Sequence, residues 1–292
     1  MAWTKGLEHI IREKEPLAPY TWLRLGGPAQ YFAEPTTVEE LRKLIKRCHE
    51  QGIPTRMLGG GSNLLVSDEG VEGVVIHLAS ASFAKIERKN GTLVVGGGAK
   101  LAHAVSVAAR EGMVGMEDLV GIPGTVGGAL HGNAGGPHDD IGTWLKSATV
   151  ITRGGETAER GRSEMHFAYR SSSLDELIIL EAVFELEDDS SVEVTKRLQM
   201  NWIVKRASLP PSSSPQGYLF RDASGMSAAS LIEQASLAGT RVGDAEISDQ
   251  NANFVLTGRN ATAADVRELI DNVRRTVHDR LGVRLDTALE IW

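Results

Sequence analysis

Residues 121–136 read GIPGTVGGALHGNAGG, a run with seven glycines, one proline and two small polar residues. Each glycine loses more backbone entropy on folding than any other residue, so a run this dense destabilises the fold. A compact protein keeps it only where the main chain must approach another group closely or adopt a positive φ. A second run, GGGSN at residues 59–63, makes the same demand. Two separated backbone cradles indicate one large, phosphate-bearing ligand.

The composition of the chain limits its class of partner and its cellular compartment. The chain has 292 residues, 41% of them hydrophobic, and a net charge of −7, which argues against a nucleic-acid partner because such surfaces are basic. No apolar stretch reaches membrane-spanning length, and the first residues lack the apolar core of a signal peptide. Cys48, the single cysteine, lies on the apolar face of an expected helix. We therefore expect a cytoplasmic protein with no membrane insertion and no internal disulfide.

Local patterns divide the chain into an α+β protein of three domains. TVEE at 37–40 resembles a capping box that starts a helix, and Asn90-Gly91 is a typical hairpin turn within 83–96. A second capped helix begins at Thr262, and 283–292 is expected to be a closing strand. The proline- and serine-rich stretch 207–215 is typical of a linker. The predicted domains are 1–80, 81–199 and 200–292.

The two glycine runs carry the binding chemistry. Consecutive N–H groups at Gly59, Gly60 and Gly61 can form an anion-binding nest, and Ser62 and Asn63 add side-chain donors. A tight turn explains this run equally well when it is taken alone. For 121–136 the alternative is a close-packing turn, but Thr125 and Asn133 lie well placed to bond polar groups of a ligand. Together the runs favour a nucleotide or dinucleotide.

At this point the sequence resembles a known family along nearly its whole length. The matching segments are TWLRLGG at 21–27, 58–66, 121–135, FAYRSSS at 167–173, 248–255 and 261–266. They resemble the UDP-N-acetylenolpyruvoylglucosamine reductases, flavoenzymes of peptidoglycan precursor synthesis in cell wall biogenesis. The short stretch between Leu237 and Ser248 is similar to the shorter of the two types in this family.

This resemblance implies a two-part FAD-binding region of the vanillyl-alcohol-oxidase type, formed by domains 1–80 and 81–199, and a substrate domain at 200–292. It implies FAD as cofactor and NADPH as reductant. Hydride would reach the enolpyruvyl β-carbon of a UDP-sugar, and a proton would then reach the α-carbon of the resulting enolate. The implied cofactor-binding residues are Gly59, Gly60, Gly61, Ser62, Asn63, Gly121, Pro123, Gly124, Thr125, Gly128 and Asn133.

Arg170 matches the catalytic arginine in the family's Tyr-Arg-x-Ser motif, and Tyr169 beside it is an expected substrate contact. A guanidinium can hold a carboxylate with two hydrogen bonds and stabilise developing negative charge. By itself, an arginine in a turn between strands is more often a surface residue. The surrounding motif favours the catalytic interpretation.

Two other family positions differ in this chain. The family segment Gly-Ser-x-Phe-Lys-Asn-Pro reads GYLFRDA at 217–223, so Tyr218 stands at the proton-donating serine and Arg221 at the lysine. Near the C-terminus, Ala288 stands at a catalytic glutamate. Tyr218 can donate a proton in place of serine, and Glu290 can reach in from two residues further along. Tyr218 could alternatively just fill the pocket. We retain Arg221 as a substrate-binding residue.

The sequence therefore predicts an FAD-dependent reductase with Arg170, Tyr218 and Glu290 as catalytic candidates. One alternative is an FAD-binding paralogue without turnover, and another is a flavin oxidoreductase acting on a different substrate. The histidines, among them His131 and His138, show no metal-ligand spacing, so no metal is expected.

Overall fold

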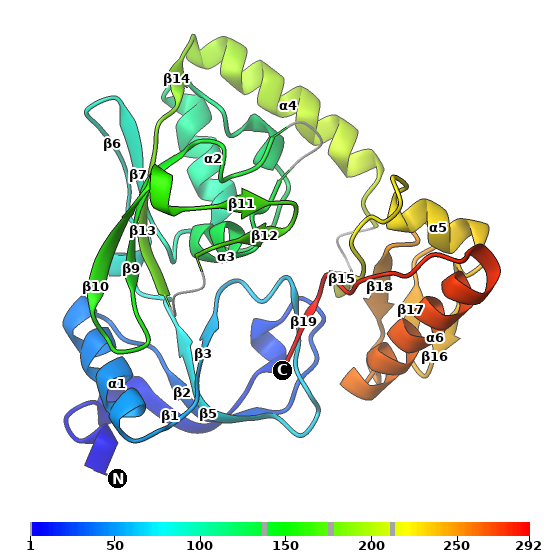
Figure 1. Ribbon diagram of the computed structural model, residues 1–292, viewed down its shortest axis with the longest axis horizontal. Helices are drawn as coiled ribbons and strands as arrows, with labels where there is room; N and C mark the ends of the chain where they lie inside the picture. The colour runs from blue at the N-terminus through cyan, green and yellow to red at the C-terminus, as the bar shows by residue number, and fades with distance from the viewer. Residues whose placement is uncertain (1, 136–138, 175–177, 211–213) are drawn as a thin grey trace. The chain divides into compact units, whose positions relative to one another are not determined.

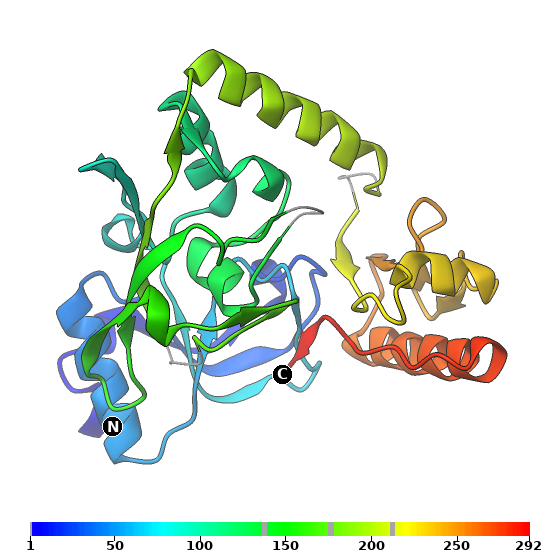
Figure 2. The same cartoon turned by 45° about the horizontal axis from the view of Figure 1, so that its top comes forward.

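The computed structural model describes residues 2–135, 139–174, 178–210 and 214–292 (Figures 1 and 2). Its mixture of helices and sheets confirms the predicted α+β class. The chain forms two compact units, and the polypeptide passes between them several times. Unit 1 comprises Met1–Glu13, Tyr31–Gly60 and Glu72–Arg206, and unit 2 comprises Lys14–Gln30, Gly61–Val71 and Ala207–Trp292. The predicted three-domain division stays a prediction.

The main sheet of unit 1 has five antiparallel strands in the order β10-β9-β13-β7-β6. Helices α2 (Leu101–Arg110) and α3 (Val126–His131) pack beside it, and α3 contacts β13 (Figure 1). Buried aliphatic residues of this sheet and these helices form one core. The strand bounds are β6 Ile86–Lys89, β7 Thr92–Gly96, β9 Leu145–Ile151, β10 Thr157–Gly161 and β13 Ile178–Phe184.

Two local predictions in unit 1 are confirmed. Asn90 and Gly91 turn the chain between β6 and β7 with φ of 51° and 78°, values that asparagine and glycine tolerate in a hairpin. Helix α1 (Val38–Glu50) begins with a capping box in which Thr37 accepts from the Glu40 N–H and Glu40 accepts from the Thr37 N–H.

Helix α1 buries Leu41, Leu44, Ile45 and Cys48, and this burial raises the pKa of the Cys48 thiol to about 11. It packs near a sheet ordered β1-β2-β5-β3, in which β3 and β5 are parallel. The strand bounds are β1 Ile11–Pro16, β2 Pro28–Ala33, β3 Thr55–Leu58 and β5 Val71–His77.

Helix α4 (Ser191–Ala207) closes unit 1 and is fastened by Arg197. The Arg197 guanidinium lies 3.2 Å from the Glu117 carboxylate and 3.0 Å from that of Asp189, and these bonds raise the arginine pKa. Shorter elements of unit 1 are β8 Met113–Val114, β11 Phe167–Ala168, β12 Ser171–Ser172, β14 Glu187–Asp188 and the 3₁₀ turns Ala2–Thr4, Glu8–Ile10, Ala81–Phe83, Glu117–Leu119 and Arg162–Glu164.

Unit 2 is a four-stranded sheet, β15-β18-β17-β16, covered by helices α5 and α6 (Figure 2). Helix α6 starts at the predicted capping box, Thr262 with Asp265, and ends at Gly282 in the left-handed conformation. Its core also takes Leu23, Leu25 and Leu65 from two distant segments. The bounds are α5 Ala228–Gln234, α6 Ala263–Leu281, β15 Gln216–Tyr218, β16 Arg241–Val242, β17 Ala245–Ile247, β18 Phe254–Thr257 and the 3₁₀ turn Ala18–Tyr20.

The predicted closing strand at 283–292 is wrong in extent. Only β19 (Glu290–Ile291) is a strand, paired in parallel with β4 (Leu64–Leu65). Upstream, Thr287 makes a single bridge with Phe220. This bridge is flanked by two hydrogen bonds, from the Arg221 N–H to the Asp286 carbonyl at 2.9 Å and from the Ala288 N–H to the Leu219 carbonyl at 2.7 Å. The N–H and C=O of Phe220 face the other way and bond the side chain of Asn253.

No helix among the described residues is both long and apolar enough to cross a membrane.

Candidate active site

The two glycine runs meet in unit 1. A Cβ built on Gly60 would lie 2.6 Å from the Gly124 Cα, and one built on Gly59 would lie 2.8 Å from the Thr125 Oγ1. Side-chain atoms do not approach backbone this closely, so the contact itself requires glycine. We call the surface formed by residues 59–60 and 121–128, all in unit 1, the glycine cradle.

A third glycine run, at 96–98, completes the support of the cradle and was missed in the sequence analysis. Gly97 accepts a hydrogen bond from the Gly127 N–H at 2.8 Å, and a Cβ on Gly97 would lie 1.9 Å from the Ile179 carbonyl oxygen. The signal was present as three consecutive glycines after an expected strand. It indicates close packing of β7 and β13 against the start of α3.

The cradle offers donors that suit a dinucleotide. Among the described residues, the N–H of Gly60 donates to no other backbone group. Gly61 has φ of 61°, the kind of backbone turn that makes an anion-binding concavity. Thr125 Oγ1 accepts from the Gly128 N–H at 3.3 Å, and its hydroxyl proton remains a donor. FAD fits these residues, because its pyrophosphate accepts hydrogen bonds and needs close backbone approach.

Gly121, the first residue of the second run, packs against α4. Gly121 has φ of 73°, and a Cβ there would lie 2.7 Å from the Trp202 ring and 3.5 Å from the Lys205 Cδ. The glycine therefore lets α4 pack directly against the residue that begins the run.

Two predicted cofactor side chains have their amides engaged within the protein. Asn63, in unit 2, donates to the Ala288 carbonyl at 2.8 Å. Asn133, in unit 1, is only 2% exposed, and its amide bonds Asp140, Ala168 and Gly142.

Tyr169 and Arg170 form the turn between β11 and β12, whose residues pair Phe167 with Ser172 and Ala168 with Ser171. Arg170 has φ of 54°, and its guanidinium lies 5.6 Å from the Tyr169 ring centroid, within cation–π range. Tyr169 is 55% exposed. The turn thus presents a half-buried cation beside an exposed aromatic ring.

Lys205 adds a second cation to this neighbourhood and was not predicted. Burial lowers the pKa of Lys205, the positive charge of Arg170 lowers it further, and Asp118 opposes both. The helix position of Lys205 gives no sequence signal, because its charged neighbours Asp118 and Arg170 come from two distant segments.

The remaining candidates lie in unit 2. Tyr218 is half-buried, and its ring packs edge-to-face on Phe254 at 5.4 Å. Arg221 is exposed, and its backbone N–H donates to the Asp286 carbonyl at 2.9 Å. Glu290 is exposed, and its carboxylate accepts from the Trp292 indole N–H at 2.9 Å. Ser62 is half-buried at the start of this unit's second segment.

Within the described ranges, no three His, Cys, Asp or Glu residues gather as metal ligands would. His131 Nδ1 lies 3.2 Å from the Leu174 carbonyl oxygen, and His138 falls outside the described residues.

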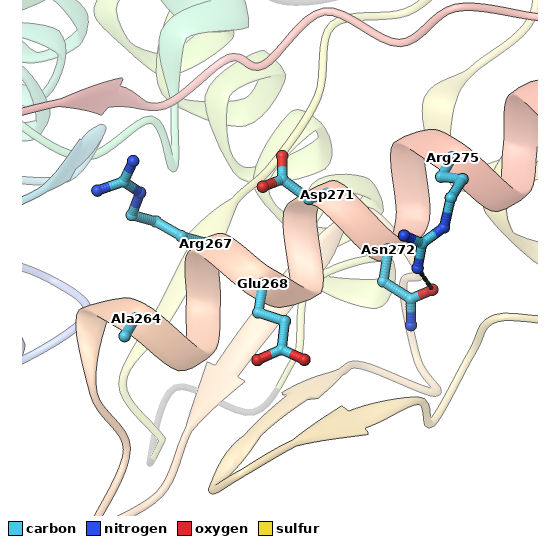
Figure 3. A pocket seen from close by; sticks show the side chains of 6 residues that line it. All are labelled: Ala264, Arg267, Glu268, Asp271, Asn272 and Arg275. Atoms are coloured by element: carbon cyan, nitrogen blue, oxygen red, sulfur yellow. Dashed lines mark hydrogen bonds between the residues drawn. The ribbon is translucent and has the colours of Figure 1, made fainter.

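A shallow hollow lies along α6 of unit 2 (Figure 3). Arg275 bonds Asn272 there, whereas Arg267, Glu268 and Asp271 point in different directions. This hollow contains none of the predicted site residues and no convergent set of polar groups.

Comparison with known proteins identifies both parts of the chain. Residues 29–161 match the family model for an FAD binding domain, and residues 210–292 match that for the C-terminal domain of UDP-N-acetylenolpyruvoylglucosamine reductase. A reductase of this name from Rhodopirellula baltica is 37% identical over 99% of this chain and 94% of its own length. Another, from Symbiobacterium thermophilum, is 42% identical over 97% and 92%. The chain belongs to the UDP-N-acetylenolpyruvoylglucosamine reductase family.

Solved structures agree with the family assignment. The reductase of this family from Thermus caldophilus superposes with a TM-score of 0.83 at 36% identity, covering 97% of this chain and 99% of that one. The protein BBE-like 1 from Physcomitrella patens shares the fold at 12% identity, with a TM-score of 0.57. The predicted FAD-binding region of the vanillyl-alcohol-oxidase type, followed by a C-terminal domain, is confirmed, and the chain is a flavin oxidoreductase by family.

Proposed function

We propose that this chain is a cytoplasmic, FAD-dependent reductase that uses NADPH to convert UDP-N-acetylenolpyruvoylglucosamine to UDP-N-acetylmuramate for peptidoglycan synthesis. The observation that carries this proposal is the similarity to reductases of that name over nearly their whole length, across both the FAD-binding and the C-terminal domain. The glycine cradle and the Tyr169–Arg170 turn supply the groups that the reaction needs.

The glycine cradle is our proposed cofactor site. Its backbone at Gly59, Gly60, Gly121 and Gly124, with that of the adjoining Gly61, would hold FAD, which supplies hydride chemistry when bound. Additional contacts would come from Ser62, Asn63, Pro123, Thr125, Gly128 and the backbone of Asn133.

Arg170 is the proposed stabiliser of the enolate. Hydride addition to the β-carbon leaves negative charge on the α-carbon and the carboxylate, and a guanidinium beside that carboxylate binds this charge more strongly than it binds the ground state. Lys205 adds positive potential, and partial burial strengthens its field. The exposed ring of Tyr169 would contact the substrate.

Tyr218 is the proposed donor of the proton that completes the reaction at the α-carbon. Its position on a paired strand and its packing on Phe254 hold the ring in one orientation. Arg221 would bind the substrate's negative charge. Because the Glu290 carboxylate already accepts from the Trp292 indole, we assign it an electrostatic role.

The test is substrate-dependent oxidation of NADPH by the purified holoenzyme. Run in D₂O, the reaction should place solvent deuterium on the α-carbon of the product. Tyr218→Phe should lower turnover by about 10²-fold or more, the usual contribution of a general acid, whereas Tyr218→Ser should retain part of it. Tyr31→Phe, at a tyrosine that packs on Trp3, is the matched control.

Two outcomes would contradict the proposal. Bound flavin without any substrate-dependent NADPH oxidation would indicate a paralogue without this turnover or one with another substrate, an outcome that Tyr218 and Ala288 make worth testing. Full activity of Tyr218→Phe would remove tyrosine from the proton-donating role.

A further inference from the structure

Asn133 lies just past the C-terminal end of α3 and is held by its own side chain. It has φ of 43°, and its buried amide makes three hydrogen bonds. Nδ2 donates to Asp140 Oδ2 and to the Ala168 carbonyl, each at 2.9 Å, and Oδ1 accepts from the Gly142 N–H at 3.2 Å. Two acceptors on one side and a backbone donor on the other fix which way the amide points.

The carboxylate that receives this amide is itself fixed. Asp140 Oδ1 accepts from the Thr143 N–H at 3.0 Å and from the Thr143 hydroxyl at 3.1 Å. Because both oxygens of Asp140 are engaged, Asn133 cannot move without breaking hydrogen bonds. The network is buried at Asn133 and Gly142 and exposed at Thr143.

The second acceptor, the Ala168 carbonyl, belongs to the residue immediately before the Tyr169–Arg170 turn. Strands β11 and β12 pair only two residues each, and a hairpin this short has little stability of its own. Its position must therefore come from contacts outside the hairpin. Asn133 supplies one, and the Ser172 hydroxyl, which donates to the His131 carbonyl at 2.9 Å, supplies another.

Both contacts lead to α3, which lies beside the hairpin (Figures 1 and 2). The other end of α3 is the cradle, where Thr125 caps the helix and Gly127 bonds Gly97. A helix of six residues is about 9 Å long, so it is a short, rigid connection. The residues that would hold FAD and the turn that carries Arg170 are built on its two ends.

We propose that Asn133 is a positioning residue: its amide sets the place of Arg170 relative to the glycine cradle. This inference rests on the proposed function, in which Arg170 stabilises the enolate. It replaces the sequence-based role of the Asn133 side chain as a cofactor ligand. A small displacement of a catalytic group lowers a rate steeply, and a misplacement near 1 Å can cost about 10²-fold.

Asn133→Gly is the test variant, because glycine removes the amide and still tolerates the positive φ. Asn90→Gly is the matched control, since Asn90 is an exposed asparagine with φ of 51° at the β6–β7 turn. For Asn133→Gly we expect unchanged FAD affinity, unchanged reduction of the flavin by NADPH, and reoxidation by UDP-N-acetylenolpyruvoylglucosamine slowed about 10- to 100-fold. Asn90→Gly should match the parent protein in all three measurements.

A double variant tests whether Asn133 acts through Arg170. In the Arg170→Ala background, Asn133→Gly should slow reoxidation no further, because the positioned group is gone. An equal slowing in both backgrounds would overturn the proposal. So would an FAD affinity lowered tenfold or more with an unchanged reoxidation rate, which would make Asn133 a cofactor ligand.

Hydrogen exchange provides a readout independent of turnover. Asn133→Gly should speed exchange of the hairpin amides, including Ser173, whose N–H donates to the His166 carbonyl at 2.8 Å, while β9 and β13 stay protected. Unchanged hairpin exchange would overturn the positioning role. The substrate could fail to reoxidise the reduced flavin of the parent holoenzyme while Asn133→Gly still speeds exchange of the hairpin amides. In that case the proposed function fails and the positioning role of Asn133 stands.

Discussion

Asn133 in unit 1 and Asn253 in unit 2 are both buried asparagines that hold a segment carrying a candidate catalytic residue. Asn133 bonds the carbonyl of Ala168, two residues before Arg170. Asn253 bonds both the N–H and the C=O of Phe220, at 2.9 and 2.8 Å, two residues after Tyr218. In both units, an asparagine amide thus hydrogen-bonds the backbone next to a candidate catalytic residue.

The regions differ in how much else holds the segment. Around Phe220, the Leu219 N–H donates to the Asn253 carbonyl and the Ala288 N–H donates to the Leu219 carbonyl, so the segment lies within a continuous network. The Tyr169–Arg170 turn belongs to a two-pair hairpin. We infer that Asn253 contributes mainly to stability and Asn133 mainly to position.

The difference also shows where sequence can change. By the family resemblance we expect the hairpin to keep a Tyr-Arg-x-Ser pattern, and the segment held by Asn253 to differ from the family at Tyr218 and Arg221. A backbone segment with many hydrogen bonds to its surroundings keeps its position when its side chains are substituted. A hairpin with few such bonds is more easily displaced by a substitution.

Arg170→Ala should have the largest effect. Removing the cation that we propose stabilises the enolate should lower the rate of substrate-dependent flavin reoxidation by about 10³-fold, or about 4 kcal/mol in the barrier. Arg170→Lys should recover part of the rate, since the charge remains and the fork is lost. Stopped-flow absorbance of the flavin measures both. Suppose that Arg170→Ala lowered the free energy of unfolding by more than it raised the activation barrier. The hairpin would then contribute mainly to stability, and its contrast with the segment around Phe220 would be lost.

Asn253→Ala should come next, with a loss of about 2–4 kcal/mol in the free energy of unfolding. It removes two hydrogen bonds and leaves a buried N–H and C=O of Phe220 without partners. Asn260→Ala, at an exposed asparagine of the same unit, should change stability by less than about 0.5 kcal/mol. Urea denaturation at saturating FAD is the measurement. An effect no larger than that of Asn133→Gly would remove the distinction between the two asparagines.

Gly60→Ala should weaken FAD binding about tenfold or more, or about 1.4 kcal/mol. The new Cβ would lie 2.6 Å from the Gly124 Cα, so the cradle must open. Gly154→Ala is the control, because the nearest atom to its Cβ is 3.8 Å away. Flavin fluorescence titration measures the affinity. Unchanged FAD affinity would mean that the backbone at Gly60 and Gly124 can move apart at little cost. Close backbone contact would then not be required for FAD binding.

Glu40→Gln should have the smallest effect, a loss of about 1 kcal/mol in the free energy of unfolding at neutral pH, because the hydrogen bonds that Glu40 accepts lie close to the surface. Hydrogen bonds from the Thr36 backbone and hydroxyl, and from His9, lower the pKa of Glu40 from 4.5 to about 2. A lowered carboxyl pKa stabilises the fold above the unfolded value, and this contribution is lost as pH falls from about 4.5 towards about 2.

The difference in unfolding free energy between the parent protein and Glu40→Gln should therefore shrink across that acidic range. The amide side chain of Asn253 does not titrate. The difference in unfolding free energy between the parent protein and Asn253→Ala should therefore stay constant over the same range. A difference for Glu40→Gln that is independent of pH would contradict the assigned cause of the lowered pKa.

Sequence alone could predict what local pattern determines. The capping boxes at Thr37 and Thr262 and the turn at Asn90 depend on residues within one turn of each other. The glycine runs could be recognised because dense glycine has few explanations. These features locate the two runs and the starts of α1 and α6 without any tertiary information.

The remainder depends on contacts between distant segments. Asn133 and Ala168 lie 35 residues apart in the chain, with β9 and β10 between them, and no residue pattern predicts that the Asn133 amide points inward. The closing segment was expected to be a strand, but only a single bridge, between Thr287 and Phe220, and the short strand β19 form there. Lys205 became a candidate only once its proximity to Arg170 was known.

The three-segment core of unit 2 has a consequence for synthesis of the chain. Leu23, Leu25 and Leu65 pack with residues of α5 and α6, which leave the ribosome long afterwards. At about 5–20 residues per second the wait is on the order of tens of seconds. During it these leucines stay exposed, so unit 2 can fold only after translation is nearly complete. A nascent chain that stalls before residue 207 would display unpaired apolar side chains, a natural target for chaperones.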